Sequence, residues 1–152
     1  MTLLIDKNQL PEYLDKLLTS DHWLKITQQR IDQFAEITED RQFIHIDPEQ
    51  AANTAFGATV AHGMLTLSLL PYFYEQAGIQ LRDVQMQINY GFDKVRFLAP
   101  VKVNSEINAS FTLREFSNPK PAQLKLKFKV IVRIKGAETP ALIGEWLALI
   151  IE

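Results

Sequence analysis

The chain has 152 residues, of which 47% are hydrophobic and 22% charged, and its formal net charge is −2. This size fits one domain with its own hydrophobic core. Because the net charge is small and basic residues do not form a run, the sequence predicts no basic surface that would bind nucleic acid or an anionic membrane. The chain contains no cysteine, which excludes a disulfide framework, a thiol nucleophile and a cysteine-based metal site and fits a reducing compartment.

The sequence predicts no secretory signal at the amino terminus and no membrane-spanning stretch. The amino terminus lacks a basic region followed by a continuous apolar stretch. The longest apolar stretch, 64–73, is interrupted by polar residues and is far shorter than the roughly 20 residues that span a bilayer. No repeat, linker or low-complexity tract divides the chain. We therefore expect one domain over residues 1–152, cytoplasmic, with no membrane or nucleic-acid partner.

The first half of the chain is predicted to be helical in pieces. Apolar residues at helical spacing indicate a helix over 9–18, and Thr27 is a suitable cap for a second helix. Asp47-Pro48 is typical of a helix start, with the aspartate as N-cap and the proline in the first turn. A helix over 62–76 is apolar nearly all round, which predicts burial on more than one side, and Gly78 is its predicted stop.

After residue 81 the hydrophobic period changes from helical to two, which indicates β-structure. The predicted strands cover 84–90, 107–113, 124–134 and 141–151. The last of them is more continuously apolar, which predicts a strand that is central or covered on both faces. Hairpin turns are predicted at 117–119 and 136–137. One buried helix followed by antiparallel strands with one apolar face indicates an α+β domain in which a sheet wraps round a central helix.

The segment 39–68 contains the residues best suited to chemistry. Asp40 and His45 form an acid-base pair, and a carboxylate with an imidazole can jointly hold and deprotonate a water molecule. Gly63 opens the apolar helix, so its backbone N–H is predicted to be available to a developing oxyanion. Together these features indicate chemistry on a polarised carbonyl. By spacing alone, however, loops often carry such an Asp and His, and a glycine at a helix start can serve close packing.

These residues, with Phe56-Gly57, 61–71 and 89–101, form a pattern that covers nearly the whole chain beyond its first twenty or so residues. The pattern resembles the MaoC-like (R)-specific enoyl-CoA hydratases, and most closely their branch named for nodulation protein N. Two positions depart from it. Glu39 stands where a glycine is usual, which could alter the local turn because glycine accepts a positive φ without steric cost. Gln42-Phe43 replaces the usual Asn-Pro, a change that the nodulation branch shares.

The resemblance implies a single hot-dog domain, in which the helix that begins at Gly63 lies inside the sheet, and a homodimer with active sites at the subunit boundary. It further implies syn hydration of a trans-2-enoyl-CoA to an (R)-3-hydroxyacyl-CoA. In that reaction Asp40 acts as the base, His45 orients the water and shuttles its proton, and the Gly63 N–H meets the thioester oxygen. No cofactor is implied. Asp40, His45 and Asp47 could imitate a metal site, but the capping role explains Asp47, and we predict no metal ion.

Four further residues are candidates for substrate binding: His62, Ser68, Lys94 and Arg96. Lys94 and Arg96 alternate with apolar residues, so they share one strand face and could meet the phosphates of coenzyme A. Each candidate also has a structural explanation. His62 could be a satisfied buried histidine, Ser68 could bond the carbonyl one turn back, and the two basic residues could belong to a solvated face. No Gly-x-Ser-x-Gly motif surrounds Ser68, so a serine hydrolase is not predicted.

Two other functions stay open at this point. A hot-dog acyl-CoA thioesterase would use a carboxylate and a helix N-terminus to cleave the same class of thioester. The protein would instead be a non-catalytic acyl-CoA-binding protein if Glu39, Gln42 and Phe43 make the site catalytically inactive. Release of free thiol distinguishes the first from a hydratase, and tight binding without turnover indicates the second.

Overall fold

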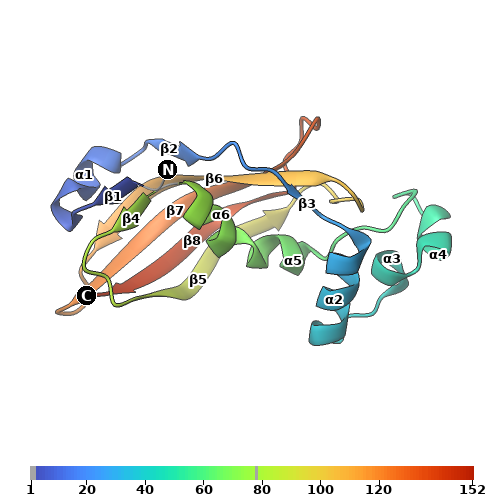
Figure 1. Cartoon of the computed structure of the whole chain (residues 1–152), viewed down its shortest axis with the longest axis horizontal. Coiled ribbons are helices and arrows are strands. Elements are labelled where there is room, and N and C mark those ends of the chain that lie inside the picture. The colour runs from blue at the N-terminus through green and yellow to red at the C-terminus, as the bar shows by residue number, and fades with distance from the viewer. Residues whose placement is uncertain (1–2, 78) are drawn as a thin grey trace.

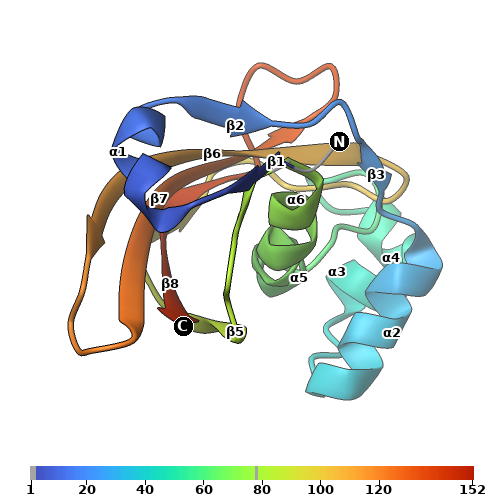
Figure 2. The ribbon, with the colours of Figure 1, turned by 60° about the vertical axis from the view of Figure 1, so that its left-hand side comes forward.

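The computed structural model describes residues 3–77 and 79–152. An antiparallel sheet curves round a helical segment, and other helices project from one end of this body (Figures 1 and 2). In chain order the elements are β1 (Leu3–Ile5), the 3₁₀ helix η1 (Lys7–Gln9), α1 (Leu10–Tyr13), β2 (Leu17–Thr19), β3 (Leu24–Lys25), α2 (Gln28–Thr38), α3 (Phe43–Ile46), α4 (Pro48–Ala52), α5 (Gly63–Ser68), α6 (Leu70–Ala77), β4 (Ile79–Leu81), β5 (Met86–Phe97), β6 (Glu106–Ser117), β7 (Gln123–Ile134) and β8 (Leu142–Ile151). The predicted α+β architecture is confirmed.

The main sheet has the strand order β2-β6-β7-β8-β5, with β3 also paired to β6. Its four long strands are antiparallel, and the two predicted hairpin turns lie between β6 and β7 and between β7 and β8. β8 is an interior strand, as its apolar sequence predicts, but only its inward-facing side chains are fully buried. A separate parallel pair, β1 and β4, joins the amino-terminal segment to the chain that follows α6.

The core lies between the concave face of the sheet and the central helical segment. Its centre is an aromatic cluster in which Tyr74 of α6 packs against Phe111, Phe128 and Trp146 of three neighbouring strands, with ring centroids 5.1 to 5.4 Å from that of Tyr74. The Trp146 side chain is fully buried, and its indole N–H donates to the Asn89 side-chain oxygen at 3.1 Å. Burial also raises the pKa of the Tyr74 phenol.

The helix predicted over 9–18 is only half correct. The chain is helical in α1 and then turns at Asp15, whose φ is +60°. The Asp15 N–H donates to the carbonyl of Leu113 at 2.9 Å, and residues 17–19 pair with β6 as β2. Pairing with the edge of the sheet therefore outweighs the helical spacing of the apolar residues in this segment, because it satisfies backbone groups that a short helix would leave to solvent.

The helix predicted over 62–76 is divided into α5 and α6. The division precedes Pro71, which has no N–H to donate to the carbonyl of Leu67 and so interrupts the helical ladder. Most apolar side chains of the two helices are buried, but Met64 is 58% exposed, so one face of α5 is open in the single chain. The predicted stop at Gly78 lies outside the described residues.

The alternation of β5 was expected to direct its apolar residues to the core, and this expectation is wrong for the first half of the strand. Met86, Ile88 and Tyr90 are 51%, 41% and 60% exposed. Gln87 and Asn89 instead lie opposite buried residues of β8, on the inner face. β5 is an edge strand in the described chain, and its outward face carries apolar residues that the rest of this chain does not cover.

The helices α2, α3 and α4 project beyond the sheet (Figure 1). Both predicted caps are confirmed. The Thr27 hydroxyl accepts from the Arg30 N–H at 3.2 Å, and an Asp47 carboxylate oxygen accepts from the Gln50 N–H at 3.0 Å. The contacts with Gln50 also lower the pKa of Asp47. Among the described residues, no helix is long and apolar enough to cross a membrane.

Candidate active site

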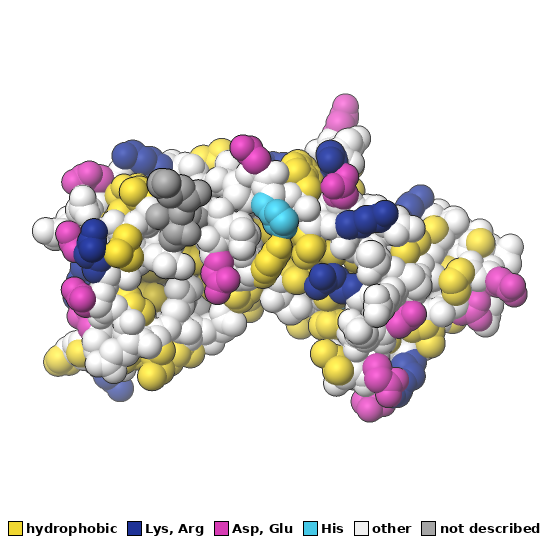
Figure 3. Space-filling view, viewed as in Figure 1, with side chains coloured by type: hydrophobic (Ala, Val, Ile, Leu, Met, Phe, Trp, Pro, Cys, Tyr) yellow, Lys and Arg dark blue, Asp and Glu magenta, His cyan; other side chains and the backbone are white. Residues whose placement is uncertain are grey.

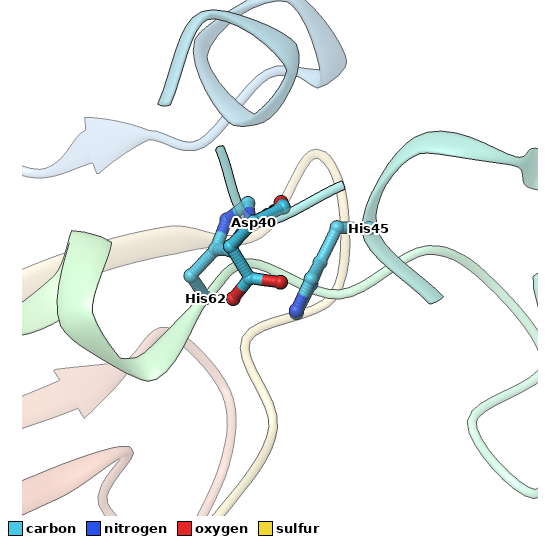
Figure 4. A group of neighbouring side chains, drawn as sticks. All are labelled: Asp40, His45 and His62. Carbon is cyan, nitrogen blue, oxygen red and sulfur yellow. Dashed lines mark hydrogen bonds between the residues drawn. The ribbon is translucent and has the colours of Figure 1, made fainter. Parts of the chain in front are cut away.

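Asp40, His45 and His62 meet where the projecting helices join the central helical segment (Figure 4). Asp40 follows the end of α2, His45 lies in α3, and His62 immediately precedes α5. One potential ligand atom of each residue lies within 4.8 Å of those of the other two. The structure thus brings the predicted Asp40 and His45 pair together and places His62, a predicted substrate-binding residue, directly beside it.

A left-handed turn directs Asp40 toward the histidines. Glu39 ends α2 with φ +62° and ψ 9°, the conformation in which glycine is the usual residue. Glu39 therefore adopts a backbone conformation that favours glycine, at the position where the resembling pattern has a glycine. The Glu39 side chain is exposed and pairs with Arg41, which also contacts Glu36 at 3.0 Å. Exposed pairs of this kind contribute little to stability.

Replacing Glu39 with glycine is expected to raise the free energy of unfolding. A left-handed conformation costs a non-glycine residue about 1–2 kcal/mol, and the greater freedom of glycine in the unfolded chain offsets about half of that, so the expected gain is about 0.5–1 kcal/mol. Urea denaturation followed by circular dichroism measures it. The control is Glu36→Gly, which removes a similar charge from the helix interior and is expected to cost about 1 kcal/mol. A loss of stability in Glu39→Gly would contradict the argument.

His45 is held as a neutral imidazole with one free lone pair. Its side chain is buried, and its Nδ1 lies 2.6 Å from the carbonyl oxygen of Val60, which can only accept a hydrogen bond. The proton is therefore on Nδ1, and Nε2 is left as an acceptor. Burial is the main reason why the pKa of His45 lies below its ordinary value; repulsion from His62 lowers it further, while Val60 and the Asp40 carboxylate act in the opposite direction.

His62 links the two predicted catalytic residues. Its Nε2 donates to the backbone carbonyl of Asp40 at 2.9 Å, and its ring stacks on that of His45 with centroids 3.7 Å apart and planes inclined by 24°. The ring also packs against Phe34, at a centroid distance of 5.0 Å. Its Nδ1 is buried without a hydrogen-bond partner among the described residues. His62 thus fixes the backbone of Asp40 and the ring of His45.

The donor atoms of Asp40, His45 and His62 are close enough to each other to be considered as metal ligands. A histidine binds a metal through a lone pair in the plane of its ring. Because the two imidazole rings are stacked rather than inclined toward a common point, their lone pairs do not converge. A water molecule held between the carboxylate and the free Nε2 of His45 suits this arrangement better than a metal ion.

An apolar cavity of about 280 Å³ adjoins His45. It is bounded by the segment before α5, by the start of that helix and by the chain that leaves β5, and its lining includes Phe56, Phe97, Val101 and Gly63. Figure 3 shows hydrophobic side chains at the surface where the projecting helices meet the sheet. A second cavity of about 250 Å³ lies beside Tyr74 and contains none of the predicted site residues. The first cavity is therefore the candidate binding site.

The position of Gly63 is compatible with both of its predicted roles, oxyanion donor and close packing. It is the first residue of α5, and its N–H has no hydrogen-bond acceptor within the described part of the chain. An added Cβ would lie only 2.9 Å from the ring of Phe97, so close packing also requires glycine here. Gly63 and Phe97 both line the cavity.

None of the four predicted substrate-binding residues, His62 included, is among the residues that line this cavity in the single chain. Ser68 is exposed and its hydroxyl donates to the carbonyl of Leu65 at 2.8 Å. Lys94 is 80% exposed in its side chain and contacts Glu145 at 3.4 Å, and Arg96 donates to the neighbouring carbonyl of Val95 at 2.7 Å. Their substrate contacts therefore stay predictions, and the structural explanation given for Ser68 has a hydrogen bond to support it.

Sequence reasoning missed the groups that hold His45 in place. One is a backbone carbonyl, that of Val60, and no side-chain pattern identifies such an acceptor. Another is Gln28, whose amide reaches the backbone carbonyl of His45 and the hydroxyl of Thr59. Gln28 occupies the first turn of a correctly predicted helix, but a polar residue there is ordinary, and its partners are 17 and 31 residues away.

Comparison with known proteins gives a consistent group of relatives. The family model described as "MaoC like domain" matches residues 12–132. Nodulation protein N of Rhizobium leguminosarum bv. viciae is 39% identical over 93% of this chain and 88% of that protein. The 3-hydroxyacyl-thioester dehydratase Z of Mycobacterium tuberculosis (strain ATCC 25618 / H37Rv) is 40% identical over 86% of this chain and 85% of that protein.

Solved structures of similar proteins share the fold. The monoamine oxidase regulatory protein from Archaeoglobus fulgius has a TM-score of 0.76 and 27% identity, covering 91% of this chain and 90% of that one. The (R)-hydratase from A. caviae, involved in PHA biosynthesis, has a TM-score of 0.72 and 25% identity, covering 89% of this chain and 94% of that one. The hot-dog fold expected from the sequence is confirmed.

Proposed function

Because the chain belongs to the family of MaoC-like dehydratases, we propose that it is a hydro-lyase that adds water to a trans-2-enoyl thioester and catalyses the reverse dehydration. The observation that carries this proposal is the neutral His45 with a free Nε2, beside the Asp40 carboxylate and at an apolar cavity. A base and a proton carrier that share one water can hydrate an activated double bond without a cofactor.

In the proposed reaction a water molecule lies between Asp40 and His45. Asp40 accepts one proton of the water, whose oxygen attacks C3 of the enoyl thioester while His45 Nε2 holds it in position. The electron pair of the double bond moves toward the thioester carbonyl, and C2 then receives, from the same side, the proton that Asp40 has accepted, which regenerates the carboxylate. Syn addition of this kind gives an (R)-3-hydroxyacyl thioester. The charge that develops on the thioester oxygen is stabilised by the Gly63 N–H.

The proposed substrate is an enoyl ester of coenzyme A. Its acyl group would lie in the apolar cavity, with the reacting carbons near His45 and the thioester oxygen near Gly63. The relative from M. tuberculosis is named for a 3-hydroxyacyl thioester, which fits the product of this reaction. Lys94 and Arg96 lie on the strand that leads to the cavity and are the proposed contacts of the coenzyme A phosphates.

We test this function with crotonyl-CoA and longer trans-2-enoyl-CoA esters. Loss of the ultraviolet absorbance of the conjugated enoyl thioester reports hydration, and a thiol reagent in a parallel sample reports hydrolysis. The proposal predicts absorbance loss without thiol release and a product of R configuration. Thiol release would instead identify a thioesterase. Tight binding of the esters with neither signal would identify a binding protein.

The pH dependence of kcat/KM is expected to follow the unusual pKa of His45. Burial lowers this pKa, so the imidazole stays neutral, and its Nε2 stays an acceptor, as the pH falls toward the ordinary histidine value of 6.5. Activity is therefore lost only below that value. Initial rates at low substrate concentration across this range locate the acid midpoint. In His62→Phe the repulsion from His62 is gone, and the midpoint should move upward. An acid midpoint above 6.5 in the wild type would contradict the assignment.

We further propose that the protein acts as a homodimer joined through β5. In the described chain one edge of this strand has no partner, and a long apolar edge strand is a ready template for pairing with a second chain. Its exposed apolar residues are Met86, Ile88, Tyr90, Phe92 and Phe97. Figure 3 shows hydrophobic side chains along the lower margin, where Figure 1 places β5. The cavity wall continues from this strand, so a partner would lie next to the site.

A further inference from the structure

The amide of Gln28 joins three segments that meet behind His45. Its Nε2 lies 2.7 Å from the backbone carbonyl of His45 and 2.8 Å from a carboxylate oxygen of Asp32, and its Oε1 lies 2.5 Å from the hydroxyl of Thr59. The orientation of this amide is set by chemistry. A carbonyl and a carboxylate can only accept, so the NH₂ group must face them, and the hydroxyl then donates to the oxygen.

These contacts complete a closed set of hydrogen bonds around the His45 ring. Thr59 is buried and directly precedes Val60, whose carbonyl accepts from His45 Nδ1 at 2.6 Å. The Val60 N–H in turn donates to the carbonyl of Ile44 at 3.0 Å. Gln28 therefore holds the backbone of α3 on one side and the segment 59–60 on the other, and the Nδ1 bond is formed between these two segments.

We propose that Gln28 and Thr59 are positioning residues that hold His45 as the Nδ1-protonated tautomer, with Nε2 free toward Asp40. Neither residue lines the cavity beside His45, so both act through His45 and not on the substrate. The tautomer of a histidine is set by the hydrogen bond at its other nitrogen, and this bond depends on the separation of α3 from Val60. The proposal rests on the proposed function in one respect, the role of His45 Nε2 in holding the water.

The key test is Gln28→Glu, which preserves the size of the side chain and reverses its hydrogen bonding. A carboxylate at this position would face the His45 carbonyl and Asp32, two acceptors, and push α3 away from Val60. We expect kcat for crotonyl-CoA to fall by about 10- to 100-fold with KM within about twofold, because a small misplacement of a catalytic group affects the chemical step more than binding. Thr59→Val removes the hydroxyl donor and should lower kcat in the same way.

Two matched variants separate positioning from general stability. Asp32→Asn alters the exposed contact of the same amide nitrogen and should keep kcat, as should Thr59→Ser, which restores the hydroxyl. The ring-nitrogen chemical shifts of His45, measured by NMR without substrate, report the tautomer directly. The wild type should show a single Nδ1-protonated form, and Gln28→Glu and Thr59→Val should show a mixture. Melting temperatures confirm that each variant is folded at the assay temperature.

The outcomes are distinct. Reduced kcat together with a changed tautomer in Gln28→Glu or Thr59→Val supports the proposal. An unchanged His45 tautomer in both variants overturns it, even if both are less stable or less active, since a purely structural role moves stability alone. Should no enoyl thioester turn over in the wild type, the proposed function fails, while the spectra still decide whether Gln28 and Thr59 set the tautomer.

Discussion

Asp40→Asn and His45→Gln are each expected to lower kcat for hydration of crotonyl-CoA by about 10²- to 10⁴-fold, the usual contribution of a general acid-base group. Asparagine keeps the size of Asp40 but cannot take a proton from the water. Glutamine at 45 can still contact the carbonyl of Val60, which His45 Nδ1 binds at 2.6 Å, but it offers no imidazole nitrogen to the water. Initial rates of absorbance loss measure both variants.

The control for these variants is Asp47→Asn. Asp47 belongs to the same short segment, but its carboxylate caps α4 through the Gln50 N–H. Asparagine is as good an N-cap as aspartate, so we expect Asp47→Asn to change stability and activity little. If Asp47→Asn lowered kcat as much as Asp40→Asn, the charge of the segment, and not a specific base, would explain the effect. If Asp40→Asn hydrated crotonyl-CoA at nearly the wild-type rate, Asp40 would be excluded as the base.

The second large effect is expected at the edge of the sheet. The double variant Ile88→Lys/Tyr90→Lys should convert the proposed dimer to a monomer, and its rate of hydration should fall as a result. Replacing a central apolar contact with a charge costs about 1–3 kcal/mol, so the two substitutions together should weaken association by at least about 30-fold. Sedimentation analysis and light scattering measure the mass, and the absorbance assay measures the rate on the same samples.

Leu17→Lys is the matched control for the edge variant. Leu17 is 59% exposed and lies on β2, at the opposite end of the sheet order from β5. It places the same charge at an exposed apolar site without touching the proposed interface, and should leave mass and activity unchanged. A wild type that is monomeric at assay concentrations and fully active would contradict the proposed dimer, as would an edge variant that keeps its dimeric mass.

The fold was largely predictable where local signals and tertiary packing agree. Thr27 and Asp47 are found at their predicted caps because the capping contact is local. The strands β6 and β7 follow the period of two in the sequence. The predictions fail where tertiary packing, and not the local sequence, determines the structure. Residues 14–18 have helical spacing but join the sheet. Met86 and Ile88 alternate as predicted, but the register of β5 directs them outward, to a face that the described chain does not cover.

In the candidate site, too, the residues of the local motif were predictable and the long-range contacts were not. The motif around Asp40 and His45 predicted which residues meet, and the family and the hydro-lyase class that it implied are confirmed by the comparisons. The contacts that hold His45 in place were not predictable. The carbonyl of Val60 is 15 residues from its partner His45, and the hydroxyl of Thr59 is 31 residues from Gln28. Such contacts depend on the three-dimensional arrangement of segments that carry no distinctive local pattern.

The departure at Glu39 illustrates a limit of motif reasoning. The residue type differs from the resembling pattern, a change that could alter the local turn, yet the backbone at Glu39 adopts the left-handed conformation that favours glycine. Tertiary contacts of the neighbouring segments, including the bond from His62 to the Asp40 carbonyl, fix that conformation and outweigh the preference of the residue. Loss of a signature glycine therefore does not imply loss of the geometry.

The most direct measurement of the central claim traces the oxygen of the attacking water. The protein is incubated with crotonyl-CoA in water labelled with a heavy oxygen isotope, and the products are identified by mass spectrometry. The account predicts the label in the C3 hydroxyl of an (R)-3-hydroxybutyryl thioester that is still intact. Label in a free carboxylate, with release of coenzyme A, would contradict hydration and assign Asp40 and His45 to thioester cleavage.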